Sequence, residues 1–358
     1  MMCSVIRAPR VGENRAHVDE TWLDGRAGTV PVNLSSEASR GVVGANKAPA
    51  WLAPDLARVE KLLLATAGSS QNPLVSEAST HLIKAGGKRV RPLIVVLSAR
   101  AGQSGLVGTD RAAAAIELIH LASLYHDDVI DETDVRRGVP TPQAKWGTAI
   151  AVLAGDYLFA SGCALGAQAG GEVPILLACA ITEVCEGQIA ETEYLGDPSR
   201  KASEYLDTIR LKTATLFRAA AELGAATSAA TPEERACLVA FGENFGIAFQ
   251  IVDDLLDLVG DPETTGKTPG TDLKEGVFTM PVLLACERDP ALLSRLARGD
   301  RDLDAILPMI EATGALSLTA TEAAAYAHKA VDALEGLPAT EWREALASLV
   351  DGVLAQVE

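Results

Sequence analysis

Three aspartates occur close together in an apolar stretch of the chain, LASLYHDDVIDETDVRRG, from Leu121 to Gly138. If this stretch is helical, Asp127 and Asp131 share one face, because residues i and i+4 lie one turn apart. Two carboxylates on one face in apolar surroundings repel each other unless a cation lies between them. Mg²⁺ prefers such oxygen ligands and commonly also binds a substrate phosphate. The stretch therefore predicts half of a magnesium site, and Arg136 and Arg137 beyond it are suited to bind a diphosphate.

The same acidic spacing returns in FQIVDDLLDLVGDPETTGKTPGTD, from Phe249 to Asp272. The acidic positions of this copy are Asp253, Asp254 and Asp257. Gln250 shares a helical face with the first and last of them. One DDxxD motif is a weak signal, since acidic pairs on helices are common and usually solvated. Two copies, each in an apolar context, are hard to explain as surface charge, so we expect two halves of one metal site.

Basic residues concentrate in GGKRVRP, between two apolar helical patterns. The glycines allow a tight bend, and Lys88, Arg89 and Arg91 bring positive charge to it. An anion-binding loop and a helix-start turn with solvated side chains explain this segment about equally well. His120 lies along the same helical face as Asp127, although a lone histidine on an apolar helix is more often a hydrogen-bonded core residue. Taken alone, Lys212 would usually be a surface lysine with a buried stem.

Helical patterns account for most of the chain beyond residue 48, and no run has the period of a strand. The composition, 48% hydrophobic and 4% aromatic, also favours helices over a β-sandwich. Residues 1–48 show no period and are expected to be a disordered N-terminal extension. The sequence thus predicts an all-α protein with one domain over residues 49–358.

The net charge of −17 makes a nucleic-acid partner or an anionic membrane surface unfavourable. An anionic substrate would need local basic residues or metal ions. The six cysteines form no CxxC pair and are expected to be reduced core thiols. The apolar region from Tyr157 to Ile181 is interrupted by Glu172 and Pro174, and no signal pattern opens the chain. We therefore expect a cytoplasmic protein without an integral membrane segment.

The motifs taken together resemble those of trans-isoprenyl diphosphate synthases of the polyprenyl synthetase family. The resemblance covers about Pro49 to the C-terminus and depends on five segments in order: GGKRVRP, HDDVIDETDVRRG, the Lys212–Thr213 pair, QIVDDLLD and GKTPGTDLKEG. It implies an isoprenoid synthase-type helical bundle in which the two aspartate-rich motifs face each other across a deep central cavity, usually in a homodimer. It also implies that isopentenyl diphosphate is condensed with an allylic prenyl diphosphate, with about three Mg²⁺ ions per site.

The family's roles can be carried over residue by residue. The resemblance implies metal binding by Asp127, Asp131 and Asp253, supported by Asp254 and Asp257. It implies binding of the allylic diphosphate by Arg136, Lys212, Thr213, Gln250 and Lys267. It implies an isopentenyl diphosphate pocket of Lys88, Arg91, His120 and Arg137. Catalytic roles are implied for Asp127, Asp128, Asp131, Arg136, Lys212, Asp253 and Lys267.

Product length is expected to depend on the face of the first motif's helix below Asp127. Short-chain members of the family resemble this chain but carry bulky aromatics at Ala122 or Ser123. The small residues here, with Ile119 and Ile116 further down, suggest an open tunnel and a product of about C30 to C50. One departure concerns Val277, where family members often have a lysine, so a diphosphate contact is missing or is supplied by Lys274.

Three alternatives remain at this point. One is a short-chain, geranylgeranyl-type synthase. A class I terpene cyclase also ionises prenyl diphosphates, but it usually lacks a second DDxxD motif and lines its cavity with aromatics. A non-catalytic synthase subunit tends to lose one aspartate motif, and both are intact here. The preferred primer, the exact product length and the pathway served are not predicted.

Overall fold

The structure, a computed structural model, describes residues 48–102, 108–260 and 269–357. The predicted N-terminal extension therefore lies outside the described residues except for Ala48, and Lys267 lies outside them too. The helices, in chain order, are η4 (Ala50–Leu52), α1 (Ala53–Ala67), α2 (Pro73–Lys84), α3 (Val90–Ser98), α4 (Thr109–Ile130), α5 (Pro142–Trp146), α6 (Thr148–Ala169), α7 (Val173–Glu193), α8 (Ala202–Ile209), η5 (Arg210–Ala214), α9 (Thr215–Ser228), α10 (Pro232–Val259), α12 (Thr271–Glu275), α13 (Met280–Arg288), α14 (Pro290–Ala297), α15 (Leu303–Ala312), α16 (Ala315–Leu334) and α17 (Glu341–Leu354).

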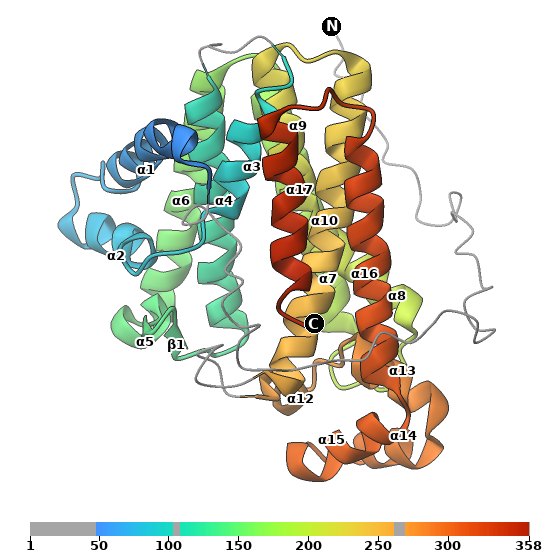
Figure 1. The fold of residues 1–358 in the computed structure, drawn as a ribbon. Helices are drawn as coiled ribbons and strands as arrows, with labels where there is room; N and C mark the ends of the chain where they lie inside the picture. Colours follow the sequence, from blue (N-terminus) through green and yellow to red (C-terminus); the bar gives the residue numbers. More distant parts are fainter. Residues whose placement is uncertain (1–47, 103–107, 261–268, 358) are drawn as a thin grey trace, which may run out of the picture.

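In the described residues the only sheet is a short antiparallel hairpin, β1 (Val135–Arg136) paired with β2 (Val139–Pro140). The all-α prediction is confirmed. Figure 1 shows long helices forming a bundle, with α14 and α15 beyond one end of it.

The two acidic motifs occupy the C-terminal ends of two long helices, α4 and α10. Helix α10 begins with a capping box, in which the Thr231 hydroxyl accepts from the N–H of Glu234 and the Glu234 side chain accepts from the N–H of Thr231. Pro232 follows at the first helical position, where its missing N–H costs nothing. Both helices end at the same end of the bundle, close to β1 and α12 (Figure 1). The backbone thus brings the two motifs to one end of the molecule.

Helix α9 joins the two motif helices into one core, because it packs against both α4 and α10. Its Phe217 meets Phe245 of α10 edge to face, with ring centroids 5.2 Å apart, and Phe249 lies at the same centroid distance. Phe217 and Phe245 are completely buried. Aromatic pairs in this geometry stabilise a core by roughly 0.5–1.5 kcal/mol beyond the area that they bury. Helix α4 packs most extensively against α6.

Three helices, α6, α7 and α10, are long and apolar enough to cross a membrane by length and composition. The interruption at Glu172 and Pro174 lies at the junction of α6 and α7 and leaves each helix at least 21 residues long. Helix length therefore does not support the prediction that an integral membrane segment is absent. In the most apolar 18-residue segment of each helix, half is buried inside the protein in α10 but only 22% in α7.

The described cysteines are free, and three of them, Cys163, Cys179 and Cys185, are exposed. The prediction that the thiols lie in the core is therefore wrong for these three. All three belong to α6 or α7. These two helices present small and apolar residues outward.

Candidate active site

The first acidic motif closes α4, with Asp127 in the last turn and Asp131 at the C-cap. The backbone N–H of Asp131 donates to the carbonyl oxygen of Asp127 at 2.8 Å, so the two side chains stay one turn apart, as predicted. The pKa of Asp127 is raised to about 6, because burial and the carboxylate of Asp131 raise it by more than Lys212 lowers it. Desolvation also raises the pKa of Asp131. The pair is therefore short of positive charge, which a divalent cation would supply.

The middle aspartate, Asp128, has a different environment. It is fully buried, and its Oδ1 accepts a hydrogen bond from the Nε of Arg136 at 2.5 Å. Arg136 belongs to β1, so this ion pair fastens the hairpin to the end of α4. The other carboxylate oxygen of Asp128 is buried and has no hydrogen-bond partner among the described residues. Asp128 thus holds Arg136 beside the motif.

Lys212 and Thr213 lie in η5, a turn of π-helix between α8 and α9. Two glycines make room for this turn. A Cβ on Gly187 of α7 would lie 2.4 Å from the backbone nitrogen of Lys212, and a Cβ on Gly246 of α10 would lie 2.6 Å from the backbone of Ala214. Since real Cβ atoms do not approach backbone so closely, glycine is required at both positions. π-Helical turns within α-helices are frequent at functional sites.

The ammonium group of Lys212 donates a hydrogen bond to Glu191 of α7. Burial lowers the pKa of Lys212, but Glu191, Asp127 and Asp131 raise it more strongly. Glu191 also raises the pKa of Asp131 and of Asp254, so it lies close to both acidic motifs. The sequence analysis missed Glu191, because a single glutamate on an apolar helix carries no distinguishing pattern.

A chain of hydrogen bonds links the Lys212–Thr213 turn to the second motif. The hydroxyl of Thr213 donates to Oε1 of Gln250 at 2.8 Å, and Nε2 of Gln250 donates to Oδ1 of Asp254 at 2.7 Å. The phenol of Tyr205 donates to Oδ2 of the same carboxylate. Burial raises the pKa of Asp254 and the two hydrogen bonds lower it, which leaves a raised pKa of about 7. Both oxygens of Asp254 thus have protein donors, which suits the supporting role predicted for it.

Asp257 organises the backbone that follows α10. Its carboxylate accepts from the N–H of Asp272 at 3.2 Å, and its carbonyl accepts from the N–H of Gly270 at 2.6 Å. These contacts position the start of α12. At the other end of α12, desolvation raises the pKa of Glu275 first, and Asp131 and Asp257 raise it further. Glu275, like Glu191, therefore lies near both motifs and was not identified from the sequence.

Three of the four residues predicted to bind isopentenyl diphosphate come together. The guanidinium of Arg91 lies 4.3 Å from the ring centroid of Phe217, and its buried Nε has no hydrogen-bond partner in the described part of the chain. Burial lowers the pKa of His120 well below its usual value, and Arg91 and Arg137 lower it further. This histidine is therefore neutral at pH 7. Lys88, the fourth residue, is exposed in the loop between α2 and α3.

The predicted chain-length residues lie on the inner part of α4. Ala122 is 0% exposed and Ile119 is 1% exposed, while Ser123 is half-buried and its hydroxyl donates to the carbonyl of His120 at 2.8 Å. Ile119 faces α6, because a Cβ on Gly162 would meet the Ile119 side chain at 3.1 Å. These residues lie on the part of α4 below Asp127, along which a prenyl tail is predicted to run.

The donor set suits magnesium that is completed by a substrate. Among the described residues, no three His, Cys, Asp or Glu side chains lie close enough to hold a metal ion alone. Mg²⁺ is usually bound by one or two carboxylates together with substrate phosphates rather than by a cage made entirely of protein. Asp127 and Asp131 at the end of α4 provide such an incomplete set, with the charges of Lys212 and Arg136 nearby, and Asp253 on α10 is predicted to add a further carboxylate.

Comparison with known proteins agrees with these observations. Residues 72–310 match the family model described as polyprenyl synthetase. The nonaprenyl diphosphate synthase of Mycobacterium tuberculosis is 40% identical over 304 residues, covering 83% of this chain and 90% of that protein.

Solved structures agree as well. A decaprenyl diphosphate synthase from Rhodobacter capsulatus superimposes with a TM-score of 0.82 at 37% identity, covering 86% of this chain and 98% of that one. A polyprenyl synthase from Caulobacter crescentus, complexed with calcium and isoprenyl diphosphate, gives 0.81 at 36% identity, covering 92% of this chain and all of that one. The predicted family and bundle fold are confirmed. The chain belongs to the polyprenyl synthetase family.

Proposed function

We propose that this protein is a Mg²⁺-dependent trans-prenyltransferase that condenses isopentenyl diphosphate with an allylic prenyl diphosphate and releases pyrophosphate. The observation that carries the proposal is the set of contacts around Lys212. Its ammonium group donates to Glu191, and the adjacent Thr213 is linked through Gln250 to Asp254 of the second motif. Asp127 and Asp131 of the first motif raise the pKa of Lys212. Two acidic motifs from distant parts of the chain therefore meet beside one lysine, Lys212. A diphosphate bridged by metal ions fits such a site.

The allylic half of the reaction uses the metal-facing carboxylates and the cations beside them. Asp127, Asp131 and Asp253 would hold Mg²⁺, which neutralises charge on the departing pyrophosphate. Lys212 and Arg136 hold the same diphosphate, joined by Thr213, Gln250 and Lys267. Donors fixed in advance around a leaving group stabilise the charge that develops on it, and losing one commonly costs about 3–4 kcal/mol of barrier. The carbon–oxygen bond then ionises to an allylic cation.

The isopentenyl half uses Arg91, His120, Arg137 and Lys88. These residues hold the second diphosphate so that its double bond lies beside the allylic cation, which turns an encounter of two molecules into a positioned reaction. The new carbon–carbon bond leaves a cation that loses a proton to the released pyrophosphate. The product is an allylic diphosphate longer by one isoprene unit, and the site must exclude water to protect the cation.

The product is proposed to be long, about C30 to C50, because Ala122 and Ser123 are small where the prenyl tail enters the protein. The names of several relatives, which include nonaprenyl, octaprenyl and decaprenyl diphosphate synthases, point the same way. A short-chain enzyme would need a bulky side chain at one of these two positions.

A second copy of the chain is proposed to cover the outer face of α6 and α7. This face exposes Leu153 (62%), Ile175 (59%) and Ile189 (61%), together with the exposed cysteines. Exposed apolar faces of this kind mark interaction sites. A homodimer buries them and leaves a cytoplasmic protein, whereas an anionic lipid surface would be opposed by the net charge of −17. Light scattering of protein purified without detergent tests this: a dimer is expected, and a monomer or a requirement for detergent would contradict it.

The activity is tested by incubating the purified protein with Mg²⁺, isopentenyl diphosphate and allylic primers of increasing length, and then sizing the products. Elongated all-trans diphosphates are expected. A cyclised hydrocarbon would instead indicate a terpene cyclase, and turnover only after a second subunit is added would indicate a non-catalytic partner.

A further inference from the structure

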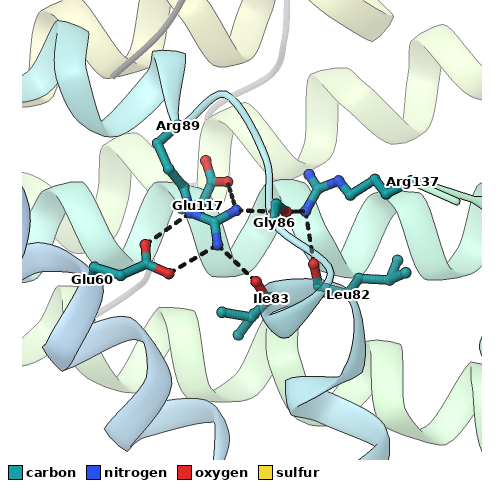
Figure 2. A network of polar contacts seen from close by, with 7 residues as sticks. All are labelled: Glu60, Leu82, Ile83, Gly86, Arg89, Glu117 and Arg137. Atoms are coloured by element: carbon teal, nitrogen blue, oxygen red, sulfur yellow. Dashed lines mark hydrogen bonds and ion pairs between the residues drawn. The ribbon is translucent and has the colours of Figure 1, made fainter. Parts of the chain in front are cut away.

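Arg89 uses its guanidinium group entirely within the protein (Figure 2). Its Nε and Nη2 donate to the two oxygens of Glu60 at 2.8 and 3.0 Å. Its Nη1 donates to Oε1 of Glu117 at 3.3 Å and to the carbonyl of Gly86 at 3.2 Å, and Nη2 also donates to the carbonyl of Ile83 at 3.0 Å. These contacts match the N–H donors of a guanidinium group one for one. Arg89 therefore has no donor left for a substrate, unlike the neighbouring Arg91.

The carbonyl of Gly86 also joins Arg89 to Arg137. Nη1 of Arg137 donates to this carbonyl and to the carbonyl of Leu82 at 2.9 Å (Figure 2). Both of these contacts use one nitrogen of Arg137. The loop after α2 is thus fastened by two guanidinium groups, and within the described ranges Arg137 donates through Nη1 alone.

The backbone at Gly87 passes directly beside these two groups. Its φ of +151° lies in a region that side chains rarely adopt, and a Cβ there would lie 2.5 Å from Nη1 of Arg89 and 2.9 Å from Nη1 of Arg137. Only glycine fits this position. The bend predicted from the sequence therefore needs glycine here, because its backbone passes directly beside both arginines.

Glu117 is the buried negative charge of this cationic cluster. It lies on α4, one turn before His120, and is 2% exposed. Burial lowers the pKa of both Arg91 and Arg137, and Glu117 raises the pKa of both. A buried charge without an opposite charge is costly, so this carboxylate is what allows several arginines to lie together.

We propose that Arg89 and Glu117 are positioning residues of the isopentenyl diphosphate pocket, which hold the loop of Gly86 and Gly87 and the guanidinium groups of Arg91 and Arg137 in place for the diphosphate. This proposal rests on the proposed function. Arg89 anchors the loop, Glu117 balances the charge, and Arg91 and Arg137 contact the substrate. Groups held in place before binding cost less entropy when the ligand arrives.

The test compares Arg89→Lys and Glu117→Gln with the wild type in steady-state kinetics, varying each substrate in turn. Lysine at position 89 keeps the positive charge but cannot donate to both carboxylate oxygens of Glu60 at once. Glutamine at position 117 keeps the shape of the side chain but removes its negative charge. The KM for isopentenyl diphosphate is expected to rise at least about tenfold in both variants. The KM for the allylic substrate and kcat at saturation are expected to change less than about threefold.

A matched control is Arg235→Lys. Arg235 donates two hydrogen bonds to Glu222 and forms an ion pair with Glu172, so its contacts resemble those of Arg89 but lie outside the proposed site. Its KM values are expected to equal those of the wild type. Thermal unfolding of every variant separates loss of fold from loss of positioning. If Glu117→Gln does not fold, Arg89→Lys and calorimetric titration with isopentenyl diphosphate decide the matter.

Unchanged KM for isopentenyl diphosphate in folded variants would overturn the proposal, as would equal changes in all kinetic constants. A wild-type protein that elongates primers while the variants behave normally would contradict this inference alone. A wild-type protein that neither elongates primers nor binds isopentenyl diphosphate would refute the proposed function and this inference with it.

Discussion

The Nε of Arg136 donates to the Oδ1 of Asp128 at 2.5 Å, and the carboxylate that accepts this bond is completely buried. The middle residue of the first acidic motif therefore differs in role from Asp127 and Asp131 on either side of it. It holds an arginine of the neighbouring hairpin beside the two metal-facing carboxylates.

Arg136→Met is expected to lose activity and also to destabilise the protein. It leaves Asp128 buried without its charge partner, which costs about 2–3 kcal/mol, below the usual value for a fully buried pair because the Arg136 side chain is 29% exposed. Adding Asp128→Asn is expected to restore most of the stability but not the activity. Urea unfolding and product assays of both variants check this. If the double variant is no more stable than the single one, the pair does not act as described.

Gly187→Ala is expected to lower kcat at least about tenfold, because the new Cβ meets the backbone of Lys212 and displaces the π-helical turn. Gly166→Ala is a matched control on the neighbouring helix, since its Cβ meets only the end of the Leu177 side chain. The control is expected to keep near-normal kcat. Equal effects of the two substitutions would show that the turn has no special requirement for Gly187.

His120 makes stability depend on pH. Its pKa is lowered in the folded state, so below about pH 6.5 the unfolded chain binds a proton that the folded chain does not. Stability therefore falls as the pH falls, by about 1 kcal/mol at about pH 5.5. His120→Asn lacks this contribution. Denaturant unfolding of both proteins without substrate, at about pH 7.5 and about pH 5.5, should show a larger loss in the wild type; equal losses would show that His120 is not held neutral.

Ala122→Phe is expected to shorten the product by several isoprene units, since an aromatic ring would block the predicted path of the prenyl tail along the face of α4 below Asp127. Reverse-phase sizing of the products measures this. The control is Leu153→Phe on α6, which introduces the same ring at an exposed position and should leave product length unchanged. A product of normal length from Ala122→Phe would refute the tunnel assignment.

Much of the site could be predicted because the motifs lie on long helices. The spacing of Asp127 and Asp131 specified one helical face, and the structure keeps these residues one turn apart. The duplicated motif indicated a shared site, and α4 and α10 do end at the same end of the bundle. Helix periodicity also predicted an all-α fold, which is confirmed.

The division of labour among similar residues could not be predicted. Lys88, Arg89 and Arg91 are similar cations in the sequence, but Arg89 is the one of the three that donates hydrogen bonds to Glu60 and Glu117 on other helices. Likewise, no local pattern marks Glu191, because its importance comes from Lys212 and Asp131, which only the tertiary fold brings near. Such roles depend on contacts distant in sequence.

The helices of the apolar region from Tyr157 to Ile181 could not be resolved from local pattern. The break between α6 and α7 was interpreted as an interruption of an apolar region, whereas it joins two helices that are each long enough to span a bilayer. Their outer faces stay exposed in a single chain, which is why we propose a second copy as their partner.

The proposed activity depends on the two acidic motifs acting together at one site. Its most direct test is the rate of prenyl chain elongation by Asp127→Asn and by Asp253→Asn, compared with the wild type at saturating Mg²⁺ and substrates, with thermal unfolding to confirm the fold. Both variants are expected to lose rate by at least about 10²-fold, since each removes a carboxylate that completes the same charge-stabilising assembly. A folded variant of either kind that elongates at the wild-type rate would contradict the account.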